Sequence, residues 1–251
     1  MNIQNMIRMH KNRLLLGLLI VVCVLASDLY AKAPGKKQRR LIASSQNPTV
    51  NVAPVDALVY QHSYQDWVAQ FSLWAFTLPP ENHPFFDETG ISIAVGQSGP
   101  VWFLVGAFNE SGLVVRNCEI PHGTALFIPV IDTQCFNFDV FGEPLSESAL
   151  ADCAKDIIDL VTNVSLTIDG RPISVSQFRV SSGLVDLSLS DNNIFGLPAG
   201  HGSLVSDGYY VILEPLNVGK HTIHFTGTFS DIGWGQDVTY NVTVSPHKHR
   251  P

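Results

Sequence analysis

The sequence predicts an all-β protein, an antiparallel β-sandwich of the jelly-roll or immunoglobulin-like type with two peripheral helices. Short runs of β-branched and aromatic residues recur along most of the chain and are separated by Gly, Pro, Asn or Ser. These runs follow one another about every ten residues, which is typical of sandwiches and jelly rolls. The alternation of strands and helices that a parallel sheet requires is missing. We therefore assign residues 58–245 of the 251-residue chain to a single β-sandwich domain.

The first 31 residues have the pattern of a secretory signal peptide. Basic side chains precede an apolar run, residues 14–26, which is shorter than the roughly 20 residues that span a bilayer. Small residues offer two alternative cleavage points, after Ala26 or after Ala31. We expect a secreted protein, periplasmic or extracellular, with no transmembrane segment after cleavage. An uncleaved membrane anchor is the alternative.

Charge separates the ends of the chain from its body. Residues 32–57 are a basic stretch and a Ser/Asn/Pro-rich lead-in, which predict a flexible arm, and residues 246–251 predict a disordered tail. The formal net charge is −7, and more than half of the basic side chains precede residue 41, so the body is acidic. An acidic body repels phosphate backbones, which argues against a nucleic-acid partner.

Two helices are expected. An aromatic stripe with spacings of three and four residues predicts a helix over residues 60–78, with Ser63 and Asp66 as its cap and a proline pair after it. We interpret the stripe as core, and a platform for stacking sugars is the alternative. The stripe consists of Tyr60, Tyr64, Trp67, Phe71, Trp74 and Leu78. A second apolar face predicts a helix over residues 146–162, with Ser146 as its N-cap.

The remaining ordered segments are predicted as strands. Asp169–Gly170 predicts a two-residue hairpin turn of type I′, and Gly96–Gly99 predicts a turn. Residues 190–207 are rich in Asn, Gly, Pro and Ser and predict a long loop. The expected strands are Ile91–Val95, Val101–Val105, Leu113–Val115, Ala125–Ile131, Val164–Ile168, Phe178–Ser182, Leu184–Leu189, Tyr209–Leu213, His221–Phe225 and Val238–Val244.

Several segments resemble a family of uncharacterised secreted bacterial proteins. These segments are Gly96–Gly106 (GQSGPVWFLVG), Arg116–Gly123 (RNCEIPHG), Gly219–Ile223 (GKHTI) and Val238–Val244 (VTYNVTV). The resemblance extends over residues 60–245, and it implies one secreted domain but no activity that can be named. The chain departs from the family at Ile93–Val95, where the family often carries a Cys before the Gly–Gln pair.

Three cysteines remain after the signal peptide, and an oxidising compartment favours a disulfide. We predict a disulfide between Cys135 and Cys153 and a single buried Cys118. A disulfide between Cys118 and Cys135 is the alternative. A catalytic Cys118 is a third reading, and it would need a neighbouring His, such as His122, and a lowered thiol pKa.

No cofactor and no metal site are predicted. The sequence contains no HExxH, P-loop or GxGxxG motif. His221 and His224 are three residues apart in an expected strand, which directs them to opposite faces of a sheet. Asp191–Asn193 resembles the beginning of a calcium loop, but Gly202 stands where such a loop needs Glu.

Ligand contacts are expected from loops at one end of the sandwich. Trp234 lies between glycines and is the leading candidate for an exposed aromatic side chain that contacts a ligand. The polar candidates are Asp207, Asp132 and His201. The expected contact loops are residues 132–145, 190–207 and 230–237.

Two arginines stand out in a chain with few basic residues. Arg116 and Arg179 lie at the ends of expected strands, and we expect each to pair with a buried acid such as Glu119 or Asp186. A guanidinium that binds the carboxylate of a substrate is the alternative.

The predicted function is a secreted binding or surface-interaction module, with a carbohydrate or an envelope protein as its partner. A secreted hydrolase or lyase is the first alternative, and a structural envelope component is the second. The hydrolase would use a pair of loop carboxylates together with a histidine. Its candidate residues are Asp132, Asp139, Glu143, Asp207, His122 and His201. The sequence leaves open whether the protein is an enzyme.

Overall fold

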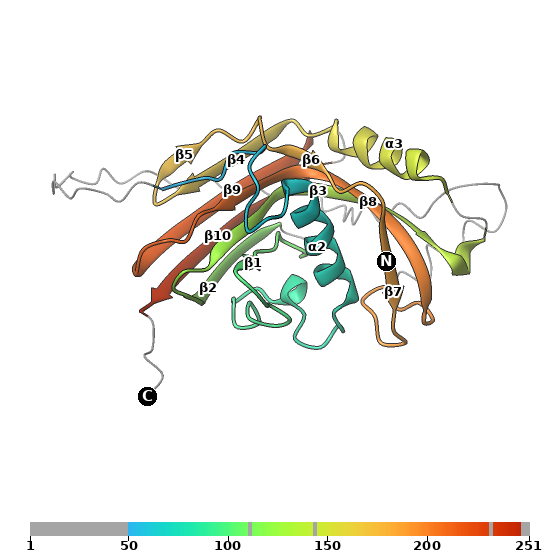
Figure 1. Ribbon diagram of the computed structural model, residues 1–251, viewed down its shortest axis with the longest axis horizontal. Helices are drawn as coiled ribbons and strands as arrows, with labels where there is room; N and C mark the ends of the chain where they lie inside the picture. Colours follow the sequence, from blue (N-terminus) through green and yellow to red (C-terminus); the bar gives the residue numbers. More distant parts are fainter. Residues whose placement is uncertain (1–49, 110–111, 143–144, 231–232, 247–251) are drawn as a thin grey trace.

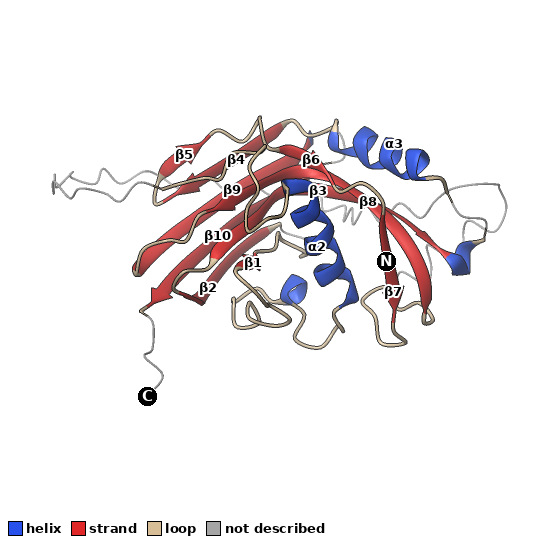
Figure 2. Ribbon diagram, in the orientation of Figure 1, coloured by secondary structure: helices blue, strands red, loops and turns tan. Residues whose placement is uncertain are grey.

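The chain folds into a mostly β structure with two α-helices among its described residues (Figure 2). This computed structural model describes residues 50–109, 112–142, 145–230 and 233–246. The predicted signal peptide, most of the predicted arm, Glu143 and nearly all of the predicted tail lie outside these residues. The described strands form two sheets of five strands each.

The first sheet is built around two long strands, β3 (Ala125–Phe138) and β8 (Gly200–Leu213), which pair antiparallel. Three short strands complete the sheet. They are β1 (Val101–Phe103), which is parallel to β3, and β6 (Arg179–Ser181) and β7 (Val185–Leu189), which both pair with β8.

The second sheet joins distant parts of the chain. Its strands, in order, are β2 (Leu113–Pro121), β10 (Trp234–Ser245), β9 (Gly219–Phe229), β4 (Asn163–Ile168) and β5 (Arg171–Ile173). The last strand, β10, runs parallel to β2. Both sheets are therefore mixed, and the prediction of purely antiparallel pairing is wrong. The cause is long-range pairing of β1 with β3 and of β2 with β10, which hydrophobic runs along a sequence do not reveal.

The two helices cover opposite faces of the first sheet (Figure 1). Cys135 and Phe136 are adjacent in β3, so their side chains point to opposite sides. Cys135 is bonded to Cys153 of α3 (Glu147–Ile158). The ring of Phe136 meets Phe76 of α2 (Tyr64–Thr77) edge-on, with centroids 4.9 Å apart. Figure 1 accordingly shows α2 inside the curve of β8 and α3 on its outer side.

The second sheet packs on the face of the first sheet that carries α3. Ile131 lies on the same side of β3 as Cys135, since the two are four residues apart in a strand. It also contacts Gly227 of β9, where a Cβ atom would come within 2.5 Å of the Ile131 Cδ1. Glycine at this position therefore allows the two sheets to approach each other.

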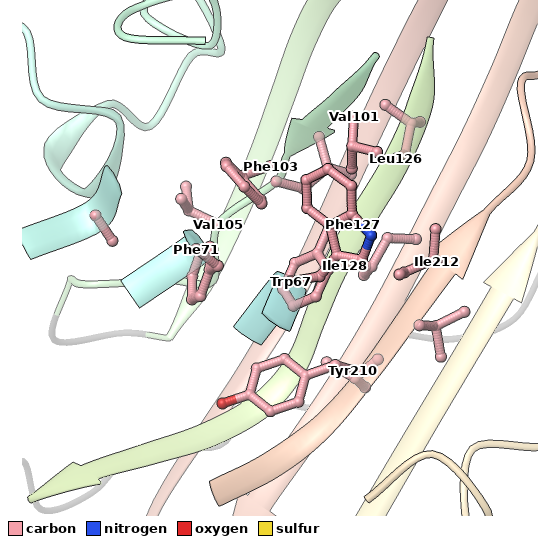
Figure 3. Close-up of a cluster of buried hydrophobic side chains, with 14 of the residues drawn as sticks. Trp67, Phe71, Val101, Phe103, Val105, Leu126, Phe127, Ile128, Tyr210 and Ile212 are labelled. Atoms are coloured by element: carbon pink, nitrogen blue, oxygen red, sulfur yellow. The ribbon is translucent and has the colours of Figure 1, made fainter. Parts of the chain in front are cut away.

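An aromatic core fills the space between α2 and the first sheet. Phe71 of α2 stacks on Phe127 of β3 at 5.4 Å and lies 5.7 Å from Phe103 of β1. Figure 3 shows Trp67 and Phe71 beside Phe127, with Tyr210 of β8 below them. All five rings are buried, which confirms that much of the aromatic stripe is core.

The first helix begins later than predicted. Ser63 is its N-cap, and its side chain forms a reciprocal capping box with Asp66, as expected. The helix therefore covers Tyr64–Thr77, and Tyr60 lies in the segment before it. The second helix begins as predicted, with the Ser146 hydroxyl accepting a hydrogen bond from the Ala149 N–H.

Two predicted segments differ in the structure. Ile91–Val95 forms turns instead of a strand. The cause is the Asp87 carboxylate, which accepts hydrogen bonds from the backbone N–H groups of Thr89, Gly90 and Ser92 and curls the chain around itself. The predicted loop 190–207 is shorter, because β8 already begins at Gly200. From there β7 pairs with one edge of β8, and from Gly202 β3 pairs with the other edge.

Candidate functional site

The most developed hollow beside the aromatic stripe is a groove of about 530 Å³. It lies along α2, between the turn Val59–His62 and the segment Gly96–Pro100. Its aromatic lining comes from both sides. These rings are Tyr60, Trp67, Trp74 and Phe103. The groove is thus made from three segments that are separate in the sequence.

The Gly96–Pro100 wall of the groove is held in place by side-chain hydrogen bonds. The Gln97 amide bonds both backbone groups of Phe103, donating to its carbonyl at 2.7 Å and accepting from its N–H at 3.0 Å. The Trp74 indole N–H donates to the Val95 carbonyl at 3.2 Å. Gly96 has φ +67°, and a Cβ there would meet the Leu78 side chain at 2.7 Å. The turn ends at Gly96, earlier than predicted, and the segment after it forms a fixed wall of the groove.

The opposite wall is the turn Val59–His62, which is fastened to the helix. Val59 and His62 exchange two backbone hydrogen bonds, of 2.9 and 3.1 Å. The indole N–H of Trp67 donates to the Val59 carbonyl at 3.0 Å. The His62 ring also packs edge-on against the Trp67 ring at 5.2 Å. Tyr60, at the tip of this turn, remains 45% exposed.

The chemistry of the groove is neutral. None of its described lining residues is Asp, Glu, Lys or Arg. Both tryptophans use their N–H groups on backbone carbonyls, so they present only ring faces and edges to the groove. The polar groups that remain come from His62, Gln70, Thr77 and Ser98 and from the Tyr60 hydroxyl. Such a surface suits an uncharged ligand with an apolar face and hydroxyl or amide groups.

Asp132, a predicted ligand contact, is half-buried in the first sheet. It is in β3, and its carboxylate accepts hydrogen bonds from the Tyr210 hydroxyl at 3.3 Å and from the Gln134 amide. Burial raises the pKa of Asp132 from 3.8 to about 6, although both hydrogen bonds lower it. Both hydrogen bonds go to the same oxygen, Oδ2, and both donors belong to the first sheet.

Asp207, the second predicted contact, is a structural ion-pair partner. It lies in β8, and its two oxygens accept from Arg179 at 3.1 and 3.0 Å in a bidentate pair. Arg179 also bonds Asp159 at the end of α3. Hydrogen bonds to Asp207 and then Asp159 raise the pKa of Arg179, against the effect of burial. The expectation that Arg179 pairs with a buried acid is confirmed, but the acid is neither Glu119 nor Asp186.

Trp234 and His201 also lie in strands. Trp234 is the first residue of β10, and its half-buried ring packs against Phe229 at 5.9 Å. His201 is exposed in β8, and its Nδ1 lies 3.1 Å from the Ser188 hydroxyl. The predicted contact loops are therefore partly strand, at residues 132–138, 200–207 and 234–237. The four predicted residues do not converge, because Asp132 and Asp207 face opposite sides of the first sheet.

Arg116 has no acidic partner among the described residues, so the prediction of an ion pair with Glu119 or Asp186 is wrong for this residue. It is 1% exposed, and it donates hydrogen bonds to the carbonyls of Asp87, Val105 and Gly106. Its Nη1 also donates to the Tyr240 hydroxyl at 2.9 Å, and its charge lies 5.3 Å from the centre of that ring. Backbone carbonyls and a ring face replace the expected carboxylate.

The cysteine predictions are confirmed. Cys135 and Cys153 form a disulfide, and Cys118 is a free, buried cysteine. Burial raises the pKa of the Cys118 thiol to about 11. The thiolate that a nucleophilic cysteine needs is therefore disfavoured at neutral pH.

The two histidines of β9 point apart, as predicted. His221 is buried and bonds the Asp169 carboxylate at 2.8 Å, whereas His224 bonds Asp237 on the exposed face. Within the described ranges, no three His, Cys, Asp or Glu side chains are grouped so that they could hold a metal ion. Among the same residues, no helix is long and apolar enough to cross a membrane.

The sequence offers a sugar-stacking platform on the aromatic stripe only as the alternative to core, and it does not predict the groove, for an identifiable reason. The stripe was expected to be one continuous helical face, whereas Tyr60 belongs to a separate turn that stands across the groove from Gly96–Pro100. A signal was present in Ser63, since an N-cap at this position places Tyr60 before the helix.

Comparison with known proteins adds little. No protein-family model matches the chain, and no curated protein matches it. Among solved structures, the chain is similar to PbICP-C in complex with falcipain-2, with 14% identity and a TM-score of 0.24 over 59% of this chain and 100% of that chain. It is also similar to amebosin, with 12% identity and a TM-score of 0.18 over 53% of this chain and 96% of that chain. TM-scores this low do not show a shared fold.

Proposed function

We propose that the protein is a secreted binding module whose groove along α2 takes a neutral carbohydrate. The observation that carries this proposal is the lining of the groove, which combines the exposed ring of Tyr60 and the half-buried ring of Trp74 with amide and hydroxyl groups and contains no Asp, Glu, Lys or Arg side chain. The apolar face of a sugar ring packs on an aromatic ring, while its hydroxyls bond amides and hydroxyls. Both walls are fastened by hydrogen bonds, so the groove is formed before the ligand arrives.

Binding is favoured over hydrolysis by the position of the acidic groups. A glycosidase places two carboxyl groups on either side of the bond it cleaves. The groove lining contains no carboxylate, and Asp132 and Asp207 are engaged by Tyr210 and Arg179 on opposite faces of a sheet. The hydrolase alternative therefore has no described acid–base pair in the groove.

Secretion is part of the proposal. It is supported by the predicted signal peptide and by the Cys135–Cys153 disulfide, a bond that persists in oxidising compartments. We also propose that the two mixed sheets form a β-sandwich related to the jelly-roll or immunoglobulin-like type, which would place the groove on a rigid scaffold.

Calorimetric titration of the purified secreted protein tests the function. The probes are neutral tetrasaccharides of glucose, mannose and N-acetylglucosamine, an oligogalacturonate as the charged counterpart, and a proline-rich peptide. The proposal predicts saturable binding of at least one neutral sugar and none of the oligogalacturonate. Binding of the peptide alone would overturn the carbohydrate assignment, because aromatic grooves also take proline-rich chains.

A matched pair of variants locates the site. Leu73 lines the groove and is 37% exposed, and Leu160 lies outside the groove lining and is 40% exposed. Leu73→Arg places a charge in the groove and should abolish binding of the neutral sugar. Leu160→Arg makes the same change at the same exposure and should leave the affinity unchanged. If the two variants change the affinity for the neutral sugar equally, the binding site is not in the groove along α2.

A further inference from the structure

The turn that presents Tyr60 to the groove has an unusual backbone. Val59 and His62 are paired as a miniature antiparallel bridge, with Tyr60 and Gln61 as the two connecting residues. Tyr60 has φ +48° and Gln61 has φ +69°. Positive φ at both central positions is the signature of a type I′ turn.

Tyr and Gln are poor residues for this conformation. A type I′ turn prefers Asn–Gly or Asp–Gly, because a Cβ atom crowds the backbone at positive φ. The chain contains the preferred version elsewhere: Asp169 and Gly170 connect β4 and β5 with φ +51° and +75°. A bulky aromatic residue at positive φ is therefore strained, and the strain is local to this turn.

Neighbouring contacts hold the strained turn in place. The Trp67 indole N–H bonds the Val59 carbonyl at 3.0 Å, and the His62 ring packs on the Trp67 ring. Tyr60 itself is 45% exposed and makes none of the ring contacts found in the core around Phe71. The surrounding structure thus fixes the backbone of Tyr60 while its side chain lines the open groove.

We propose that Tyr60 is a ligand-contacting residue of the groove, held over the ligand by a turn whose backbone strain the fold maintains. This proposal rests on the proposed carbohydrate function and names a residue whose side chain contacts the sugar. A strained residue that is exposed at a groove and not needed for packing is the arrangement expected of a ligand clamp. Its ring would close one side of the sugar, opposite the wall formed by Gly96–Pro100.

Three substitutions test the clamp. Gln61→Gly should raise the melting temperature by about 2–4 °C, since at positive φ the relief of backbone strain outweighs the greater entropy of glycine in the unfolded chain, and it should leave the affinity for the sugar within about twofold. Tyr60→Asn should not lower the melting temperature, and it should weaken sugar binding at least about tenfold. Tyr60→Phe keeps the ring and should retain most of the affinity.

Melting temperature and sugar affinity together separate the proposal for Tyr60 from the proposed carbohydrate function. Melting temperature is measured without ligand, so it reports the strain whatever binds in the groove. A lower melting temperature for Gln61→Gly, or a marked loss for Tyr60→Asn, would make the turn a structural element and overturn the clamp. If a sugar binds wild type and Tyr60→Asn equally, the clamp fails and the carbohydrate function stands. If no neutral sugar binds, both fail.

Discussion

The two faces of the first sheet are held by different chemistry. On one face, α2 packs through aromatic rings and leaves a neutral groove along its flank. On the other face, α3 is fastened by a disulfide and by the ion pairs of Arg179. In these ion pairs the guanidinium of Arg179 bonds the carboxylates of Asp159 and Asp207. The comparison shows that Arg179, Asp159 and Asp207 serve to hold the fold together on the α3 face. The candidate binding surface lies where charge is absent.

The largest expected effect on the free energy of unfolding comes from a substitution on the aromatic face. Phe71→Ala removes a buried ring that contacts Phe103, Phe127 and Tyr210, and it should lower the free energy of unfolding by about 3–5 kcal/mol. Leu73→Ala, on the exposed side of the same helix, should cost less than about 1 kcal/mol. Urea denaturation measures both. Similar losses in the two variants would show that α2 does not carry the core.

The next effect concerns the disulfide on the α3 face. The double variant Cys135→Ala/Cys153→Ala removes a bond that joins residues 18 apart, and it should cost about 2–4 kcal/mol of unfolding free energy. The α3 face is separate from the groove, so the affinity for a sugar should be unchanged in the folded variant. Loss of binding at temperatures where the variant is fully folded would contradict the independence of the two faces.

The half-buried carboxyl of Asp132 gives a pH-dependent effect on stability of opposite sign to the usual one. Its pKa is raised to about 6 in the folded protein, so the folded state binds the proton more tightly than the unfolded chain does. Its contribution to stability is therefore present below about pH 4 and is lost as pH rises through about 6. Asp132→Asn should remove this loss, and it should be more stable than wild type at pH 7 by about 1–3 kcal/mol.

Asp207→Asn is the control on the opposite face. It breaks the bidentate pair with Arg179, so it should destabilise the protein at pH 7 instead of stabilising it. Unfolding free energies of wild type and both variants between pH 4 and 8 test the contrast. A stability difference between Asp132→Asn and wild type that does not change with pH would contradict the account of Asp132.

The smallest effect is expected at Trp234. Its ring is half-buried against Phe229, so Trp234→Ala should cost about 1–2 kcal/mol. It lies outside the groove lining, and sugar affinity should not change. A variant that keeps its melting temperature but loses sugar binding would restore the prediction from sequence that Trp234 contacts the ligand.

Local features of the fold could be predicted from the sequence, whereas long-range pairing could not. Ser63 marks the beginning of α2, Asp169–Gly170 marks a turn, and the Cys135–Cys153 disulfide links a strand to the helix that follows it. These signals act over a few residues or within one loop. The parallel pairing of β2 with β10 brings together residues far apart in the sequence, such as Leu113 and Asp237, and no local pattern encodes it.

The candidate site shows the same limit. Asp132, Asp207 and Trp234 were chosen because polar and aromatic residues in loops often bind ligands, but each lies in a strand and is engaged by a neighbour. The groove forms only when the folded chain brings Tyr60 and Gly96–Pro100 to the side of α2, and this tertiary arrangement cannot be read from local sequence. The sequence identifies most of its aromatic residues, but it does not show which of them are buried in the core and which are exposed in the groove.

Tryptophan fluorescence during titration with neutral tetrasaccharides tests the central claim most directly. Two of the four tryptophans, Trp67 and Trp74, line the groove, while Trp102 and Trp234 do not. The account predicts a saturable change in emission that is strongly reduced in Trp74→Phe and retained in Trp234→Phe. A change that disappears in Trp234→Phe and persists in Trp74→Phe would contradict it, as would the absence of any saturable change with every neutral sugar.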